Sequence, residues 1–367
     1  MASNLIDTER LPALRSRIRG CLLGGAIGDA LGAPVEFLSL EEIHAQFGPF
    51  GIREFAAAYG RLGAITDDTQ MTLFTAEGLL RASVRGRLKG IVNVTSAVCH
   101  AYVRWLLTQD VAPAMEPDNI SRNGWLWAVQ DLHARRAPGL TCLESLKKRT
   151  RCGDSRAEND SKGAGAIMRI APIARLVDGD DAGAARRIFE CAKTCAWITH
   201  GHPSGYLSAA AFAVILHALL WGHSIEEGVD RAVPILELDP DSKETVSAIR
   251  QALSLVEQGI VGREAIARLG AGWVGEEALA IALYCALTER DFERAVCLAV
   301  NHGGDSDTTG LLVGQLIGAQ VGVEALPARW LEQLELRQTI ETIADDLTDF
   351  PDWDVETKVV NERYPGG

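Results

Sequence analysis

The chain has 367 residues, of which 47% are hydrophobic, and it carries a formal net charge of −13 at pH 7. This length supports one large domain or two ordinary ones with a sizeable buried core. The acidic balance argues against broad nucleic-acid binding, which needs a basic surface, and is compatible with bound cations.

The first 19 residues are polar and charged and lack the apolar core of a signal peptide. We predict an N-terminal arm over residues 1–19 and a single domain over residues 20–367. The arm either touches a partner protein or forms an ordinary solvated helix. The longest apolar stretch, residues 206–221, contains Ser208 and His217 and is short for a membrane span. We therefore expect a cytoplasmic protein that spans no membrane.

Most of the periodic segments repeat their apolar residues at intervals of three and four, which is the spacing of a helix. Alanine and leucine, both good helix formers, dominate these segments. The expected helices cover residues 71–82, 92–107, 182–197, 207–220, 244–257, 276–287 and 292–300. Strand-like segments at 65–66 and 233–238 are too short to build a sheet, so the predicted class is all-α.

Two helical stretches carry glycine at every fourth residue, at positions 20, 24, 28 and 32 and at positions 310, 314, 318 and 322. Such spacing leaves a smooth helix face that a second backbone can approach closely. In a membrane it would favour helix dimerisation. Polar residues border or interrupt both stretches, among them Arg19, Asp29, Gln315 and Gln320. Close packing of helices in a soluble core is therefore the preferred interpretation.

Three irregular segments, residues 47–63, 108–123 and 150–165, are expected to line a site rather than to divide the chain into domains. The eight cysteines include no CxxC pair. Cys191 and Cys195 lie four residues apart on one expected helix face, and a zinc site would need a second such pair. We expect buried thiols in a reducing compartment.

Two short acidic clusters lie far apart in the sequence. One is Thr66-Asp67-Asp68-Thr69, and the other is residues 305–309, Asp-Ser-Asp-Thr-Thr, preceded by two glycines. Each cluster stands where a helix is expected to begin, so the carboxylates could simply complement helix dipoles. Four carboxylates would also balance two divalent cations, and all-oxygen ligands suit Mg²⁺ or Mn²⁺. We favour a two-metal site built from both ends of the chain.

Five blocks in a fixed order make the chain resemble the ADP-ribosylglycohydrolase family. They are residues 20–32 with Glu36, then 66–69, 159–169, 199–203 and 303–310. The resemblance runs from residue 20 to about residue 322 and is nearest to the branch of ADP-ribosylarginine hydrolases and dinitrogenase-reductase-activating glycohydrolases. Ala164 departs from the pattern, because relatives in that branch often carry Cys there.

The resemblance implies a compact, all-α, single-domain orthogonal helical bundle that removes mono-ADP-ribose from arginine side chains of modified proteins. It also implies two bound Mg²⁺ or Mn²⁺ ions. The implied metal ligands are Thr66, Asp67, Asp68, Asp305, Asp307 and Thr308, and Glu36 and Asp68 are the catalytic candidates. Glu36 could instead be a solvated charge at a helix end.

The resemblance further implies an ADP-ribose subsite. The loop of Ser161, Lys162, Gly163 and Gly165 is a candidate phosphate cradle, because small residues let backbone N–H groups approach a diphosphate. Asn159 and Asp160 either anchor this loop or face the substrate. His200 aligns with a family histidine near ADP-ribose, although a cap or core role is an alternative. Trp273 either stacks on the adenosine or packs in the core.

Three rival functions remain at this point. Within the family, the linkage could be ADP-ribosylserine or an ester such as O-acetyl-ADP-ribose. A two-metal phosphohydrolase would need cations aimed at the phosphate, for which Lys162 and Arg169 are the obvious candidates. A crystallin-like, non-catalytic relative is the non-enzyme alternative. In biology the chain could reverse a regulatory modification or one made by an ADP-ribosyltransferase toxin.

Overall fold

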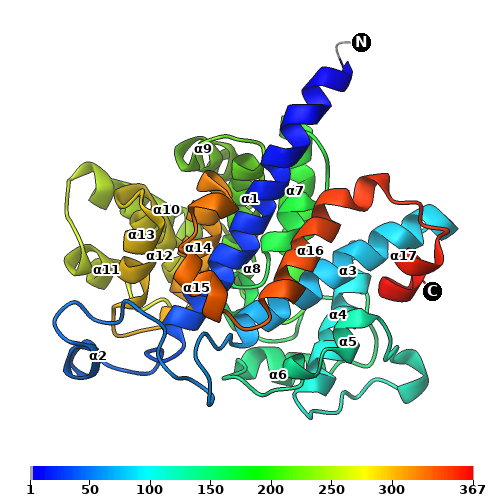
Figure 1. Ribbon diagram of the computed structural model, residues 1–367, viewed down its shortest axis with the longest axis horizontal. Coiled ribbons are helices and arrows are strands. Elements are labelled where there is room, and N and C mark those ends of the chain that lie inside the picture. The colour runs from blue at the N-terminus through cyan, green and yellow to red at the C-terminus, as the bar shows by residue number, and fades with distance from the viewer. Residues whose placement is uncertain (1–2, 367) are drawn as a thin grey trace.

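The computed structural model describes residues 3–366, and over this range it contains helices and no strands (Figure 1). The all-α prediction is therefore confirmed. The α-helices are α1 Ser3–Gly32, α2 Leu40–Phe47, α3 Asp67–Lys89, α4 Val94–Thr108, α5 Trp125–Ala128, α6 Leu140–Lys147, α7 Ala182–Ala196, α8 Pro203–Leu220, α9 Ile225–Leu236, α10 Lys243–Glu257, α11 Arg263–Leu269, α12 Gly275–Thr288, α13 Phe292–Val300, α14 Ser306–Val321, α15 Ala328–Gln333, α16 Arg337–Asp349 and α17 Lys358–Arg363.

The seven expected helices all fall on observed ones, within three residues at either end except where α3 and α8 extend further. The strand-like segment 233–238 is not extended, because its first four residues complete α9 around Pro234. The boundary predicted after residue 19 falls inside α1, which runs unbroken past it. Arg15 and Arg19 hold this part of α1 against α16 through Asp345. Contact of the N-terminal segment with a partner stays a prediction.

The two glycine-rich stretches pack against each other as the antiparallel pair α1 and α14, which lie side by side in Figure 1. Gly20 faces Gly318, Gly24 faces Gly314 and Gly28 faces Gly310. A Cβ placed on Gly24 would lie only 2.4 Å from the Gly314 oxygen, and one on Gly28 would lie 2.0 Å from the Gly310 oxygen. The predicted close backbone approach is confirmed, and it places the C-terminal end of α1 beside the N-terminal end of α14.

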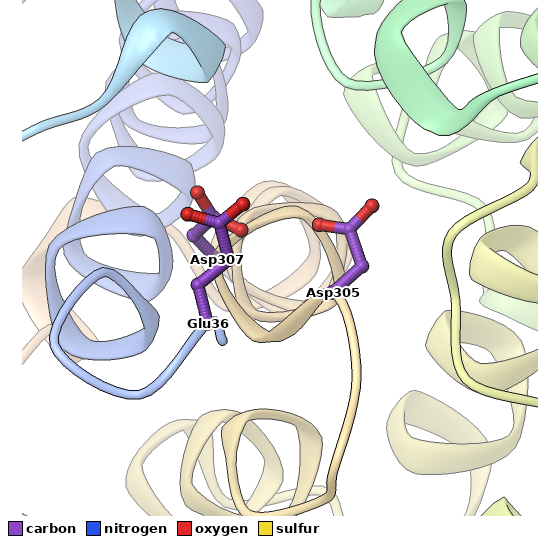
Figure 2. Close-up of side chains that lie close together, drawn as sticks. All are labelled: Glu36, Asp305 and Asp307. Carbon is purple, nitrogen blue, oxygen red and sulfur yellow. The ribbon is translucent and has the colours of Figure 1, made fainter. Parts of the chain in front are cut away.

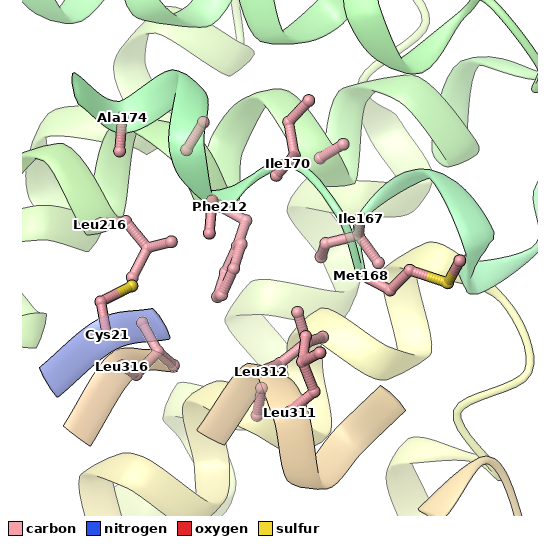
Figure 3. Packing of buried hydrophobic residues seen from close by; sticks show 14 of the residues in the cluster. Cys21, Ile167, Met168, Ile170, Ala174, Phe212, Leu216, Leu311, Leu312 and Leu316 are labelled. Carbon is pink, nitrogen blue, oxygen red and sulfur yellow. The ribbon is translucent and has the colours of Figure 1, made fainter. Parts of the chain in front are cut away.

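Helix α8 passes through the middle of the bundle and packs on α7, α9 and α12. Its side chains are apolar all round, as expected of a helix with neighbours on every side. Figure 3 shows Phe212 and Leu216 of α8 among Leu312 and Leu316 of α14. Of the described helices, α8 alone is long and apolar enough to cross a membrane, and 94% of it is buried inside the fold.

The expectation that all the cysteines are free thiols is wrong for two of them. Cys99 of α4 and Cys152 form a disulfide, with their Cα atoms 5.6 Å apart. The pairing arises because the segment after α6 folds back over the start of α4, where Asn93 donates a hydrogen bond to Asp154. The remaining six cysteines are free. The cellular location stays a prediction.

Candidate active site

The first acidic cluster begins α3. Thr66 is the N-cap, and its side-chain oxygen accepts a hydrogen bond from the Asp68 N–H at 3.2 Å. Asp67 and Asp68 follow in the first turn, and both are buried. Gly139, just before α6, donates its N–H to Asp67 Oδ2 at 3.1 Å. The cap interpretation is thus correct for Thr66, but it does not explain why both aspartates are withdrawn from solvent.

The second cluster begins α14. The chain must pass close to Ala271 here, because the Asp305 N–H donates to the Ala271 oxygen at 2.9 Å and a Cβ on Gly304 would lie 2.0 Å from that oxygen. Asp307 lies in the first turn of α14, where its Oδ1 accepts the N–H of Thr308. The Thr308 hydroxyl donates to Asp68 Oδ2 at 2.8 Å. This bond joins the two clusters, which are 240 residues apart.

Glu36 completes the group from the turn that follows α1. One carboxylate oxygen from each of Glu36, Asp305 and Asp307 lies within 4.8 Å of the other two, and all three residues are buried (Figure 2). Glu36 Oε2 is buried without a hydrogen-bond partner among the described residues. A solvated helix-end charge is therefore excluded for Glu36, which is 7% exposed.

Asp29 is a further buried carboxylate that motif reasoning left without a role. It lies on α1 and is fully buried. Its carboxylate accepts the backbone N–H of Thr66 and of Thr69, as well as the Thr69 hydroxyl at 2.5 Å. Asp29 therefore holds the start of α3 in place from the glycine-rich helix. Its presence in a stretch of otherwise small and apolar residues was the available signal.

These carboxylates crowd one another in a buried space. Burial raises the pKa of Glu36 to about 10 and that of Asp29 to about 7, and the charge of Asp307 adds to both shifts. Burial is also the largest cause of a raised pKa at the other carboxylates of the cluster: Asp67, Asp68, Asp305 and Asp307. Like charges in a poorly solvated space disfavour ionisation, and divalent cations would reverse that preference.

The predicted phosphate loop is built against the segment that precedes α12. Ala164 donates its N–H to the Trp273 oxygen at 3.0 Å, and Gly275 donates to the Lys162 oxygen at 2.8 Å. Asn159 anchors the loop, because its Oδ1 accepts the N–H groups of Ser161 and Gly201 at 3.0 Å each. Asn159 thus anchors the loop, as one alternative had it, and both Asn159 and Asp160 are exposed.

His200 lies directly under the glycines of this loop. A Cβ on Gly165 would lie 3.2 Å from the His200 ring, and one on Gly163 would lie 3.4 Å from it. The ring is buried, and its Nδ1 lies 2.8 Å from the Thr199 hydroxyl, which also accepts a bond from Arg169. Burial, followed by the charge of Arg169, lowers the pKa of His200 to about 3. The imidazole is therefore neutral and supports the loop from below.

Lys162 and Trp273 have surroundings that the sequence did not indicate. The Lys162 ammonium forms ion pairs with Glu276 and, at 3.1 Å, with Glu244. Trp273 is 43% exposed and stacks on Phe37, with ring centroids 5.9 Å apart and planes 15° from parallel. Core packing is thus excluded for Trp273, and because Phe37 follows Glu36, the aromatic pair lies at the edge of the carboxylate cluster.

The three irregular segments do not share one role. In the first, burial raises the pKa of Tyr59, and the charge of Glu36 adds to the rise, so this residue borders the cluster. The third lines a cleft of about 740 Å³ together with α6, from Leu140 to Ser161. Residues 118–121 of the second instead line a separate cavity.

The model of the family described as ADP-ribosylglycohydrolase matches residues 10–354. The chain belongs to the ADP-ribosylglycohydrolase family. It is 27% identical over 333 residues to the ADP-ribosyl-[dinitrogen reductase] glycohydrolase of Rhodospirillum rubrum, which covers 89% of this chain and 92% of that protein. It is 26% identical to the ADP-ribosylarginine hydrolase Tri1 of Serratia proteamaculans, over 90% of this chain and 78% of that protein.

Other relatives in the family carry different names. The ADP-ribosylhydrolase ARH3 of Mus musculus is 24% identical over 90% of this chain and 91% of that protein. A solved ADP-ribosylglycohydrolase-related protein complex matches with a TM-score of 0.61 and 28% identity, covering 92% of this chain and 99% of that chain. The chain is therefore a glycohydrolase by family, and the linkage that it cleaves is a separate question.

Membership in this family agrees with what the arrangement of side chains allows. The described carboxylate and hydroxyl oxygens converge from α1, α3 and α14, and oxygen donors of this kind fit Mg²⁺ or Mn²⁺ better than Zn²⁺. Glu36 Oε2, which has no hydrogen-bond partner among the described residues, is one further oxygen that could coordinate a cation. The residues present thus fit a divalent cation site.

Proposed function

We propose that this protein is a metal-dependent hydrolase that removes mono-ADP-ribose from arginine side chains of modified proteins. The observation that carries the proposal is the buried group of Glu36, Asp305 and Asp307, joined to Asp68 through Thr308. The six oxygen ligands proposed for two Mg²⁺ or Mn²⁺ ions come from the starts of two helices: Thr66, Asp67, Asp68, Asp305, Asp307 and Thr308.

The proposed reaction breaks the bond between the anomeric carbon of ribose and the guanidinium nitrogen. Bound divalent cations supply positive charge that holds vicinal hydroxyls and makes water a stronger acid. Glu36 and Asp68 are the groups proposed to exchange the proton with water and with the departing guanidine. Their negative charge also favours the positive charge that develops at the anomeric carbon.

The remaining predicted contacts belong to the ADP-ribose moiety. We propose that the N–H groups of the phosphate loop over residues 162–165 face the diphosphate, except that of Ala164, which bonds the Trp273 oxygen, and that His200 packs beneath the loop and supports it. Lys162 adds positive charge at the rim of this loop, reduced by its two acidic partners. The stacked Phe37 and Trp273 offer an aromatic face beside the carboxylates, which suits the ribose or adenosine end of the ligand.

Arginine is the linkage that we prefer over serine or an O-acetyl ester. The relatives named for arginine or for dinitrogen reductase support this preference, whereas those named ARH3 support the alternative within the same family. The physiological partners are then arginine-modified proteins, including those modified by a regulatory or toxin-derived transferase.

The test is ADP-ribose release from arginine-modified and serine-modified proteins, with Mg²⁺ or with EDTA. We expect release from the arginine substrate only with Mg²⁺, and a loss of at least about a hundredfold in an Asp305→Ala/Asp307→Ala variant. The matched control is Asp352→Ala/Asp354→Ala, which removes two exposed carboxylates at the same spacing.

Each outcome of this test is informative. Release that persists in EDTA and in the Asp305/Asp307 variant contradicts the metal-dependent mechanism. Release from the serine substrate alone transfers the proposal to the alternative linkage. Tight binding of ADP-ribose without release from either substrate contradicts an enzymatic role and favours a binding protein.

A further inference from the structure

A second cavity, well separated from the carboxylate cluster, is lined by basic side chains. It lies between α3, α4, residues 118–121 and residues 365–366, and its volume is about 610 Å³. Three arginines and a histidine line it, together with one exposed carboxylate, Asp118: the basic residues are Arg81, Arg85, His100 and Arg104. This concentration of positive charge is unexpected in a chain whose net charge is −13.

The charges around this cavity do not balance. Glu77 is fully buried and faces two guanidiniums. Arg104 donates two hydrogen bonds to Glu77 Oε2, at 3.1 and 2.7 Å, and Arg81 Nε lies 3.4 Å from Glu77 Oε1. One carboxylate is therefore the counter-ion of two guanidiniums, those of Arg104 and Arg81, which are 2% and 7% exposed. A buried charge without a counter-charge is unfavourable, so an anion in the cavity would stabilise the pair.

Donor groups at this cavity are available for such an anion. Arg81 Nε forms no hydrogen bond among the described residues, but it is buried 3.4 Å from Glu77 Oε1, and NH2 of the same guanidinium donates to Asn123, so Arg81 contributes charge rather than a free donor. Arg85, half-buried, donates one bond, from NH1 to the Gly366 oxygen at 3.2 Å, which leaves other N–H groups of its guanidinium for a ligand. Guanidinium groups match the geometry of phosphate and carboxylate oxygens. The rim is polar, with side chains that suit hydroxyls of an organic ligand: Asn93, Ser96, Asn119 and Ser121.

The cavity is remote from the carboxylate cluster along α3. Asp68 lies in the first turn of this helix and Arg81 lies 13 residues further on, which corresponds to about 20 Å. The two ends of α3 thus carry opposite charge. Since one rigid helix joins them, a ligand at the Arg81 end contacts the same element that positions Asp67 and Asp68.

We propose that this cavity is a second ligand site, which binds a phosphate group either as inorganic phosphate or as a small phosphate monoester. The excess positive charge of the two buried arginines selects the anion, Arg85 supplies a further charge-assisted contact, and the polar rim accommodates any attached sugar. The proposal is independent of the hydrolase activity, because it uses none of the residues assigned to that activity.

Calorimetric titration of the full chain with inorganic phosphate and, separately, with a nucleoside monophosphate tests the proposal at constant ionic strength. We expect one saturable site, weakened at least about tenfold in Arg85→Gln, which removes one charge-assisted contact. Ala97→Phe keeps every charge but places a ring in the cavity, and we expect it to weaken binding. Tighter binding of the monoester identifies the larger ligand, and equal binding identifies free phosphate.

Two controls separate this cavity from other basic or metal-binding groups. Arg87 also lies on α3, is exposed, and donates a hydrogen bond to the Phe350 oxygen. Arg87→Gln should therefore leave the affinity for phosphate unchanged. The Asp305→Ala/Asp307→Ala variant should also bind normally. The proposal is overturned by absence of saturation in the parent chain, by unchanged binding in Ala97→Phe, or by loss of binding only in the Asp305/Asp307 variant.

Discussion

Replacing Gly24 with alanine tests how closely the two glycine-rich helices must approach. The new Cβ would lie 2.4 Å from the Gly314 oxygen and 3.0 Å from a ring carbon of Phe292. The first distance is about 1 Å shorter than a normal van der Waals contact. Because the clash is with backbone, no side-chain rotation relieves it, and α1 and α14 must separate.

The expected loss can be worked from two opposing effects. Overpacking of a rigid interior costs about 3 kcal/mol at the upper end of its usual range. Alanine recovers about 1 kcal/mol because it is the better helix former. We therefore expect the Gly24→Ala variant to lose about 2 kcal/mol of unfolding free energy, measured by urea denaturation. Its affinity for Mg²⁺ should also fall, since separation of the helices moves Glu36 away from Asp305 and Asp307.

Gly153→Ala is the matched control, because a Cβ at this loop position meets no atom within 4 Å. It should unfold at the same urea concentration as the parent chain. A Gly24→Ala variant that equals or exceeds the parent in stability, with unchanged Mg²⁺ affinity, would refute the claim that backbone contact between α1 and α14 positions the carboxylates.

Three further predictions concern stability. Mg²⁺ at a hundredfold excess over its dissociation constant should raise the unfolding free energy by about 2.7 kcal/mol relative to EDTA, and an equal urea midpoint in both would argue against a cation site. Burial opposes ionisation of Asp345, but hydrogen bonds from Arg19 and Arg15 outweigh this effect and lower the Asp345 pKa. The resulting stability is present above the ordinary pKa and lost as pH falls through the lowered pKa, so Asp345→Asn should cost about 1 kcal/mol at pH 7 and progressively less below the ordinary pKa. A pH-independent cost would contradict this. Cys152→Ser, which opens a loop of 53 residues to Cys99, should cost about 4 kcal/mol, dithiothreitol should have the same effect on the parent, and Cys191→Ser should have none.

Local pattern was sufficient for the fold class and for the expectation that two glycine-rich helices pack closely. The three-and-four spacing of apolar residues depends only on helix geometry, so it located helices without knowledge of their partners. The fourfold glycine spacing was more informative, because two smooth helix faces of equal length match each other. It predicted that each stretch packs closely on another helix, and the structure shows that the two stretches are each other's partner.

The carboxylate cluster could be predicted in part, because chemistry linked its members. Four buried acids need a common counter-charge, which favours one site over two. Asp29 was missed for a physical reason: its effect is to bind backbone N–H groups of α3, and no spacing rule predicts which turn a carboxylate will reach.

Pairings that depend on tertiary structure were beyond sequence reasoning. Phe37 and Trp273 stack because a turn and a loop from distant parts of the chain meet at the cluster. The ion pairs of Lys162 depend on where α10 and α12 lie. The disulfide could not be predicted either, since eight cysteines allow many pairings and only the returning loop selects one.

The antiparallel contact of α1 with α14 also bears on the order in which the protein acquires its structure during synthesis. Glu36 leaves the ribosome about 270 residues before Asp305, and closing so long a loop is entropically unfavourable. The glycine face of α1 therefore has no partner helix until most of the other helices have been synthesised. Contacts of such long range form late and slowly. A nascent chain that stops before residue 305 therefore lacks the partner of its first helix and two carboxylates of the cluster, Asp305 and Asp307.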